Sequence, residues 1–262
     1  MQLISQHSLV SQLTALGVAP GDGVFVHASL RAIGPVIGGP RAVILALHDA
    51  VGGDGLIAMP GVSTDAYFPE WLDRSSLSQP EVMAVEAAVP GFDPAPSPTT
   101  GMGAIAELFR TWPGTVRSAH PGVSVCINGR DAAKFTQEHA RGFACGPGTP
   151  FVSLMERPAA KVLLLGVGWN RCTMLHTAET LARPRRLKVR RQKEGGRWHE
   201  NEDVADDIGR LFPAAGASFE ATGAVSEGSV GNAVAKLAPM AELVRFATAF
   251  ISAANRESGD RA

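Results

Sequence analysis

The fold is decided by residues 161–168, which read KVLLLGVG. An almost uniformly apolar run that ends among glycines predicts a β-strand buried on both faces of a sheet. Two similar runs, VFVHASL at 24–30 and GLIAMP at 55–60, predict further strands. Helical apolar stripes lie at 6–16 and 41–51. Strands that alternate with helices indicate a layered α/β sheet.

The remainder of the chain shows patterns of the same two kinds. The other expected elements are a strand at 123–127 and helices at 104–112, 132–139, 151–155, from Asn170 or Thr173 through Leu181, and at 233–254 with a break near Pro239. Either Thr99 or Thr100 is expected to cap the helix at 104–112. The sequence shows no internal repeat and no linker, which predicts a single domain over residues 1–262.

The charge of the chain is balanced in total but uneven in its distribution. Lys and Arg number 24 against 25 Asp and Glu, a net charge of −1, which excludes the basic excess of a nucleic-acid-binding protein. Residues 61–98 nevertheless carry six acidic side chains and one basic one, whereas residues 183–197 carry eight basic and one acidic. We interpret the acidic stretch as a functional insertion, with a merely solvated face as the alternative. The basic stretch is expected to form an exposed hairpin arm.

Cysteine usage and the N-terminal sequence bear on where the protein works. Cys126, Cys145 and Cys172 are odd in number and lack C-x-x-C spacing, which argues against a disulfide framework and a structural zinc site. The first ten residues lack the pattern of a signal peptide, and the most apolar segment is much shorter than the ~20 residues of a membrane helix. We therefore expect a cytoplasmic protein without a membrane partner.

Two histidines stand where ligand crevices form. His27 lies near the end of a predicted strand, and such strand ends line crevices in open α/β sheets, although a purely structural histidine fits equally well. His176 and Glu179 lie three residues apart on the helix after the strand at 161–168, which places both on one face. A carboxylate beside an imidazole is typical of a general base, although such pairs also occur on solvated faces.

A second candidate site is the glycine-rich sequence TTGMGAIAE at 99–107. A turn that leads into a helix presents free backbone N–H groups, which suits a phosphate group. Close packing of the helix on the sheet is the more common reason for such glycines. Ser118 and His120 follow the same helix and are candidates for the same crevice, although Pro121 is also typical of a plain turn.

Six blocks of the sequence together match a known enzyme family. They read VHASLRAIGPVIGGPRAVILAL, FDPAPSPTTGMGAIAELFR, RSAHPGVSV, CGPGTPF, KVLLLGVGWNRCTMLHTAE and GNAVAKLAPMAELVRFATAFI. This ordered set resembles the aminoglycoside 3-N-acetyltransferase family. The resemblance implies a three-layer α/β/α sandwich distinct from the commoner acetyltransferase fold. It also implies acetyl-coenzyme A as the donor, no metal, and an amino group of a deoxystreptamine antibiotic as the acceptor.

The resemblance also implies roles for individual residues. The essential histidine of the family falls on His176 and its supporting carboxylate on Glu179, and His27 would lie near the reaction centre. The donor site would be lined by Ser29, Leu30, Arg31, Thr100, Met102, Gly103 and Ser118. The family usually has Ser where this chain has Ala28, a change that alters one hydrogen bond near the donor.

The expected acceptor is a polycation, which suits an acidic surface. We expect the stretch at 61–98 to attract it, with Asp65, Glu70 and Asp93 as candidate contacts. The expected reaction is direct transfer, in which His176 removes a proton as the amine attacks the thioester.

Several alternatives remain open at this stage. Cys172 or Cys145 would be the nucleophile if an acyl-enzyme formed. The acceptor could be a different small amine, or the protein could bind coenzyme A without turnover. A metal-dependent hydrolase would use as ligands His27, His120, His176 and Glu179. The arm at 183–197 either contacts the 3′-phosphate of coenzyme A or is simply exposed, and the chain is expected to be a monomer or a homodimer.

Overall fold

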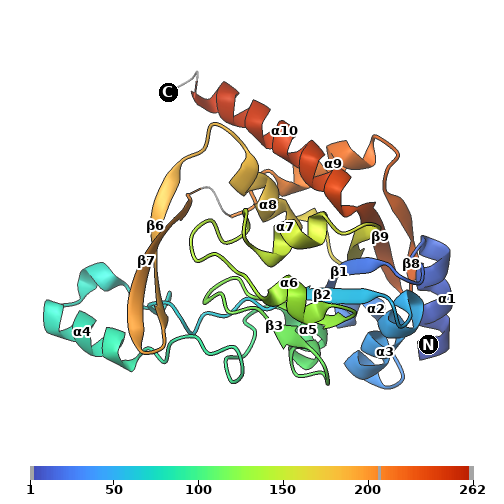
Figure 1. Cartoon of the computed structure of the whole chain (residues 1–262), viewed down its shortest axis with the longest axis horizontal. Coiled ribbons are helices and arrows are strands. Elements are labelled where there is room, and N and C mark those ends of the chain that lie inside the picture. The colour runs from blue at the N-terminus through green and yellow to red at the C-terminus, as the bar shows by residue number, and fades with distance from the viewer. Residues whose placement is uncertain (1–2, 206–207, 260–262) are drawn as a thin grey trace.

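A computed structural model describes residues 3–205 and 208–259, and its centre is a mixed β-sheet (Figure 1). Within this part of the chain the sheet has seven strands in the order β3-β4-β2-β1-β5-β9-β8. Their bounds are β1 Gly23–Ala28, β2 Leu56–Pro60, β3 Val116–Arg117, β4 Val125–Gly129, β5 Ala160–Leu165, β8 Ser226–Val230 and β9 Ala233–Pro239. Strands β2, β1 and β5 are parallel, and antiparallel strands flank them on both sides. Strand β1 therefore lies at the middle of the sheet, with its carboxyl end between two parallel neighbours.

Helices cover both faces of this sheet. Those on one face are α1 Gln6–Leu16, α3 Gly39–Val51 and α5 Gly103–Arg110. Those on the other face are α6 Ala132–Thr136, α7 Pro150–Met155, α8 Met174–Leu181, α9 Phe212–Glu220 and α10 Met240–Gly259. Short helical turns also occur at α2 Leu30–Ile33 and η2 Trp169–Arg171. The three layers confirm the predicted α/β/α sandwich.

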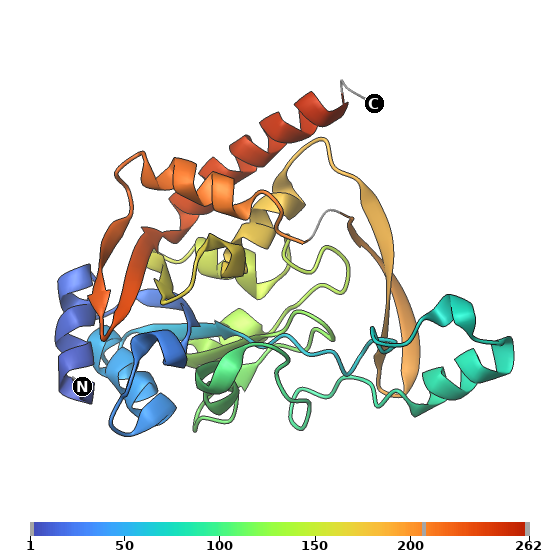
Figure 2. The same ribbon diagram turned by 180° about the vertical axis from the view of Figure 1, so that it is seen from behind.

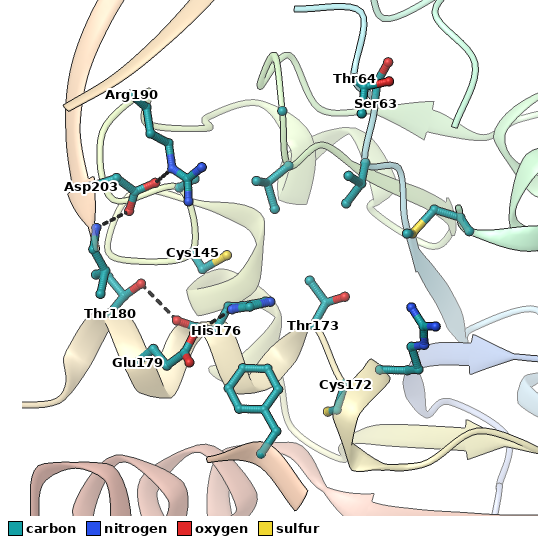
Figure 3. A pocket seen from close by; sticks show the side chains of 18 of the residues that line it. Ser63, Thr64, Cys145, Cys172, Thr173, His176, Glu179, Thr180, Arg190 and Asp203 are labelled. Carbon is teal, nitrogen blue, oxygen red and sulfur yellow. Dashed lines mark hydrogen bonds and ion pairs between the residues drawn. The ribbon is translucent and has the colours of Figure 1, made fainter. Parts of the chain in front are cut away.

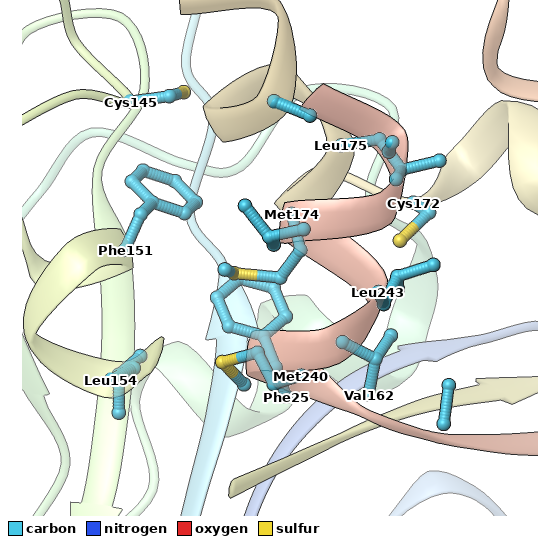
Figure 4. Close-up of a cluster of buried hydrophobic side chains, with 14 of the residues drawn as sticks. Phe25, Cys145, Phe151, Leu154, Val162, Cys172, Met174, Leu175, Met240 and Leu243 are labelled. Atoms are coloured by element: carbon cyan, nitrogen blue, oxygen red, sulfur yellow. The ribbon is translucent and has the colours of Figure 1, made fainter. Parts of the chain in front are cut away.

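The alternation of side chains along the central strands creates two separate cores. Val24 and Val26 of β1 pack toward α1 and α3, whereas Phe25 packs with Phe151 and Leu243 on the opposite face. Figure 4 shows the second cluster, in which aromatic, aliphatic and methionine side chains fill the space between the sheet and α10. Because β1 is buried on both faces, burial of its side chains holds its carboxyl end in a fixed position.

Two segments extend away from the sandwich. The insertion at 61–98 contains the turn η1 Arg74–Ser76 and the helix α4 Gln79–Ala88, and the arm forms the hairpin of β6 Leu187–Glu194 and β7 Arg197–Val204. Both views place the hairpin beside α4, at the end of the molecule remote from α1 (Figures 1 and 2). The hairpin continues seven residues beyond the predicted end of the arm at 197.

The expected elements agree best at the first helix and the three parallel strands. The helix at 6–16 and the strands near 24, 55 and 161 occur where their patterns predicted them. The helix predicted over 233–254 occurs only after Pro239, as α10, and its first part was wrong, because residues 233–239 form β9 between β5 and β8. Its alanines favour a helix locally, but pairing with two strands overrides that preference. No helix in the described ranges is both long and apolar enough to cross a membrane.

The prediction that Thr99 or Thr100 caps α5 was also wrong. The helix begins at Gly103 after Met102 and has no side-chain cap. Thr99 instead contacts Glu107, which accepts hydrogen bonds from its backbone N–H and its hydroxyl, both at 2.7 Å. The Thr100 hydroxyl accepts a hydrogen bond from the backbone N–H of Thr64 at 3.1 Å, which ties the end of the insertion to its beginning.

Candidate active site

Two cavities meet beside the carboxyl end of β1. The strand-end cavity, of about 390 Å³, lies between residues 26–31 and the turn 101–106 that starts α5. The insertion cavity, of about 450 Å³, lies between the insertion, the β6–β7 hairpin and the start of α8 (Figure 3). Met102, Arg171 and Thr173 line both cavities. Molecules bound in the two cavities would therefore face each other across η2 and the start of α8.

The strand-end cavity gathers most of the residues that the family resemblance assigns to the donor. Ser29, Leu30, Arg31, Met102 and Gly103 all line it. The Ser29 hydroxyl caps α2 by accepting a hydrogen bond from Ala32 N–H at 3.3 Å. Gly103 has a φ of +84° and open space where a Cβ would stand, so the backbone turns into α5 without a side chain over the cavity.

Two residues predicted for the donor site lie outside both cavities. The hydroxyl of Thr100 is hydrogen-bonded to Thr64, so it links the two ends of the insertion. Ser118 is fully buried, where its hydroxyl donates a hydrogen bond to Nδ1 of His139 at 2.8 Å and accepts one from Val125 N–H at 2.9 Å. Ser118 therefore links His139 to β4 through hydrogen bonds and does not line either cavity.

His27 lies at the edge of the strand-end cavity, with 5% of its surface exposed. Its Nε2 atom accepts a hydrogen bond from the backbone N–H of Thr173 at 3.2 Å, and its ring stacks on Phe25 with centroids 5.2 Å apart. Burial, together with the smaller effect of nearby His176, lowers the pKa of His27 to about 3. The imidazole is therefore neutral near neutral pH.

His176 and Glu179 form a dyad on α8 that faces the insertion cavity. Nδ1 of His176 lies 2.7 Å from Oε2 of Glu179, a carboxylate that is 8% exposed. Phe212 packs edge-on against the imidazole with ring centroids 4.8 Å apart. Figure 3 shows the imidazole extending from α8 toward Thr173, with the carboxylate behind it. Because Nδ1 is bonded to the carboxylate, Nε2 is the nitrogen that can exchange a proton with a molecule in the cavity.

The acidic residues of the insertion are used in different ways. Glu70 lines the insertion cavity at its exposed rim, whereas Asp65 lines a neighbouring groove. Asp93 is exposed and outside both cavities, where its carboxylate accepts a hydrogen bond from Ala95 N–H at 2.9 Å. Asp73 and Glu81 cap the turns and helices of the insertion. Among the expected acceptor contacts, only Glu70 reaches this cavity.

An acidic residue that the sequence analysis did not select lies deeper in the same cavity. Asp203 of β7 is 6% exposed and accepts a hydrogen bond from Nε of Arg190 at 2.8 Å. The only sequence signal for it was an acidic run, 200–207, that follows the basic arm. Its position depends on the hairpin folding back over α8, which local sequence does not specify.

The hairpin and the insertion hold each other in place through Arg191 and Lys193, a role that was not foreseen for the basic arm, whereas Arg183 and Arg186 of the same arm are exposed as expected. Arg191 forms an ion pair with Glu86. The ammonium of Lys193 donates to the backbone carbonyls of Glu86, Ala87 and Val89 at 2.9, 3.1 and 2.6 Å, which satisfies the carboxyl end of α4. These contacts hold the insertion against the hairpin, and other residues of both segments line the insertion cavity.

Tight packing positions the segment shared by the two cavities. The Trp169 ring lies against Gly216 of α9, where an added Cβ would stand 2.1 Å from the ring. Trp169 also donates its indole N–H to Glu220. The buried tryptophan thus fixes η2, and with it Arg171 and Thr173.

The cysteines and the remaining histidines bear on the alternative chemistries. Burial raises the pKa of Cys172 to about 12 and also raises that of Cys145, so both thiols are protonated and poor nucleophiles. Both ring nitrogens of His120 are already hydrogen-bonded. Nδ1 accepts hydrogen bonds from the backbone N–H groups of Gly122 and Val123, and Nε2 donates one to the Arg141 carbonyl. Across residues 3–205 and 208–259, no three His, Cys, Asp or Glu side chains are grouped as metal ligands.

Comparisons with known proteins agree with this geometry. Residues 25–252 match the family model described as aminoglycoside 3-N-acetyltransferase. An aminoglycoside N(3′)-acetyltransferase-like protein of Bacillus subtilis, YokD, is 34% identical over 93% of this chain and 90% of its own. Aminoglycoside N(3)-acetyltransferase III of Pseudomonas aeruginosa is 33% identical over 93% and 92%. A solved structure of AAC-IIIb with CoASH superposes with a TM-score of 0.85 at 30% identity, covering 95% of this chain and 97% of that one.

Proposed function

The chain belongs to the aminoglycoside 3-N-acetyltransferase family, and from this premise we propose that it transfers an acetyl group from acetyl-coenzyme A to the 3-amino group of a 2-deoxystreptamine aminoglycoside. The observation that carries the proposal is the meeting of two cavities at Thr173. One has a glycine-rich helix start, and the other contains an imidazole–carboxylate dyad and acidic side chains. The coenzyme in the related AAC-IIIb structure supports the choice of donor.

We propose that the acetyl donor occupies the strand-end cavity and the amine the insertion cavity. Backbone N–H groups at the start of α5, which has no side-chain cap, suit the phosphates of the donor. Glu70, Asp203 and Glu179 give the insertion cavity carboxylates that suit a polycation. The reacting groups would then meet near Thr173 and His176.

The proposed mechanism is direct transfer. An ammonium group is not a nucleophile, so Nε2 of His176 accepts its proton while Glu179 stabilises the imidazolium that forms. The amine nitrogen then forms a bond to the thioester carbonyl carbon, and the carbon–sulfur bond breaks as the carbonyl re-forms. The proton on His176 passes to the departing coenzyme A thiolate, and the acylated nitrogen releases its second proton to solvent, which leaves a neutral amide. The raised pKa of Cys172 supports transfer without an acyl-enzyme.

A thiol-release assay tests this function. The purified protein is incubated with acetyl-coenzyme A and a panel of 2-deoxystreptamine aminoglycosides, with linear polyamines as the comparison. We expect release of coenzyme A with aminoglycosides, a product acetylated at the 3-amino group by NMR, and a raised inhibitory concentration for cells that express the gene. Release with polyamines alone would assign a different acceptor, and no release with any amine would refute the proposal.

A further inference from the structure

His27 presents a hydrogen-bond donor at the place where the two cavities meet. It lines the strand-end cavity and is bonded to Thr173, which lines both. Its Nε2 atom accepts the Thr173 N–H, and a neutral imidazole with an acceptor at one nitrogen carries its hydrogen on the other. Nδ1 of His27 is therefore an N–H donor. The backbone N–H of Thr173 is already hydrogen-bonded to Nε2 of His27 and holds the imidazole ring in place.

The two histidines of the site have opposite surroundings. His176 has a carboxylate 2.7 Å from its Nδ1. His27 has no such partner among the described residues and is stacked on Phe25 in a buried position. With a pKa of about 3, His27 is a very weak base and keeps its neutral form through the working pH range. A buried, neutral and immobile N–H group is suited to donate a hydrogen bond rather than to move a proton.

We propose that Nδ1–H of His27 stabilises the thioester oxygen during acetyl transfer. This inference rests on the proposed function. As the amine nitrogen bonds to the carbonyl carbon, the carbonyl π electrons move onto the oxygen, and a donor placed beforehand stabilises that charge. When the carbon–sulfur bond breaks, the electron pair returns and the carbonyl re-forms. The hydrogen stays on His27 throughout, so His27 is a catalytic residue distinct from the base.

A matched pair of variants tests the roles of the two ring nitrogens of His27 separately. In His27→Gln the amide replaces the Nε2 end and can still accept the Thr173 N–H, but the donor at Nδ1 is lost. In His27→Asn the amide nitrogen stands near Nδ1, and the acceptor for Thr173 is lost. For His27→Gln we expect kcat to fall about 10²–10³-fold, with little change in the dissociation constant of acetyl-coenzyme A by calorimetry. His27→Asn keeps a donor near the position of Nδ1, so its kcat should fall less than that of His27→Gln.

A spectroscopic measurement tests the contact without turnover. In the unmodified protein, the infrared band of the carbonyl in [1-¹³C]acetyl-coenzyme A should move to lower frequency on binding, because a donor to the oxygen weakens the C=O bond. The shift should disappear in His27→Gln and persist in His27→Asn. Binding without a shift in the unmodified protein would overturn this role for His27 alone, even if both variants failed to fold. Failure of the unmodified protein to bind acetyl-coenzyme A would overturn the proposed function as well.

Discussion

The strand-end cavity and the insertion cavity share a wall but are built in opposite ways. Residues 26–31 and 101–106 form most of the first, and each run belongs to one strand end or one helix start. The second draws on segments scattered from Val62 to Phe212. The first depends on local geometry at the middle of the sheet, whereas the second exists only when the insertion and the hairpin have docked. Changes to the second should therefore affect the acceptor without affecting the donor.

The largest expected effect comes from removal of the proposed base. His176→Ala should lower kcat/KM by about 10²–10⁴-fold, because proton transfer from the amine is lost. The affinity for acetyl-coenzyme A should stay the same, since the imidazole faces the insertion cavity. Steady-state kinetics and calorimetry measure the two quantities. His7→Ala, on the exposed surface of α1, is the control. Near-normal turnover in His176→Ala would remove it from this role.

Acid should destabilise the wall of the insertion cavity. Burial lowers the pKa of His139 to about 3 and also lowers that of His120, whereas an unfolded histidine titrates near 6.5. The unfolded chain thus binds more protons, so stability is full above pH 6.5 and falls as pH drops toward 3. One such histidine contributes up to about 1.4 kcal/mol per pH unit in that window. Urea unfolding at pH 7, 5.5 and 4.5 measures the slope.

His139→Gln provides the comparison for this pH effect. Its amide preserves a polar contact near the Ala144 carbonyl but does not titrate. The variant should therefore lose less stability between pH 7 and 4.5 than the unmodified protein. An identical slope in both proteins would show that protonation of His139 does not contribute. Hydrogen exchange should show faster opening of residues 118–146 at low pH than of β2 and β5, which contain no histidine.

Loss of the contact between hairpin and insertion should weaken acceptor binding alone. Lys193→Met leaves three backbone carbonyls at the end of α4 without their ammonium donor, at a cost of about 1–3 kcal/mol. We expect the acceptor KM to rise about tenfold and hydrogen exchange across 66–92 to accelerate. Lys134→Met, at an exposed position on α6, is the matched control. An equal loss of acetyl-coenzyme A affinity would show that the cavities are not independent.

The same contrast explains how much the sequence could predict. His27 was selected from its place at one strand end, and His176 and Glu179 from their spacing on one helix, whereas Ser29 and Arg31 were selected only through the family resemblance; all five line one of the two cavities. Asp203 was missed because its place depends on the fold-back of the hairpin. The basic arm looked like a ligand or solvent surface, yet its Arg191 and Lys193 contact the acidic insertion. Charge patterns show that two segments complement each other but not that they meet.

The smallest expected effect tests the rim of the insertion cavity. Glu70 is exposed, and an exposed ion pair contributes about 0.2–1 kcal/mol, so Glu70→Gln should raise the acceptor KM only about two- to five-fold. Because exposed charges are screened, the difference from the unmodified protein should shrink as salt rises from 50 to 500 mM. Glu81→Gln is the control, since that carboxylate caps α4 and lies outside the cavity. Equal changes of KM in both variants would show that the acceptor is attracted by the net charge of the insertion. They would contradict a specific contribution of Glu70 at the rim of the cavity.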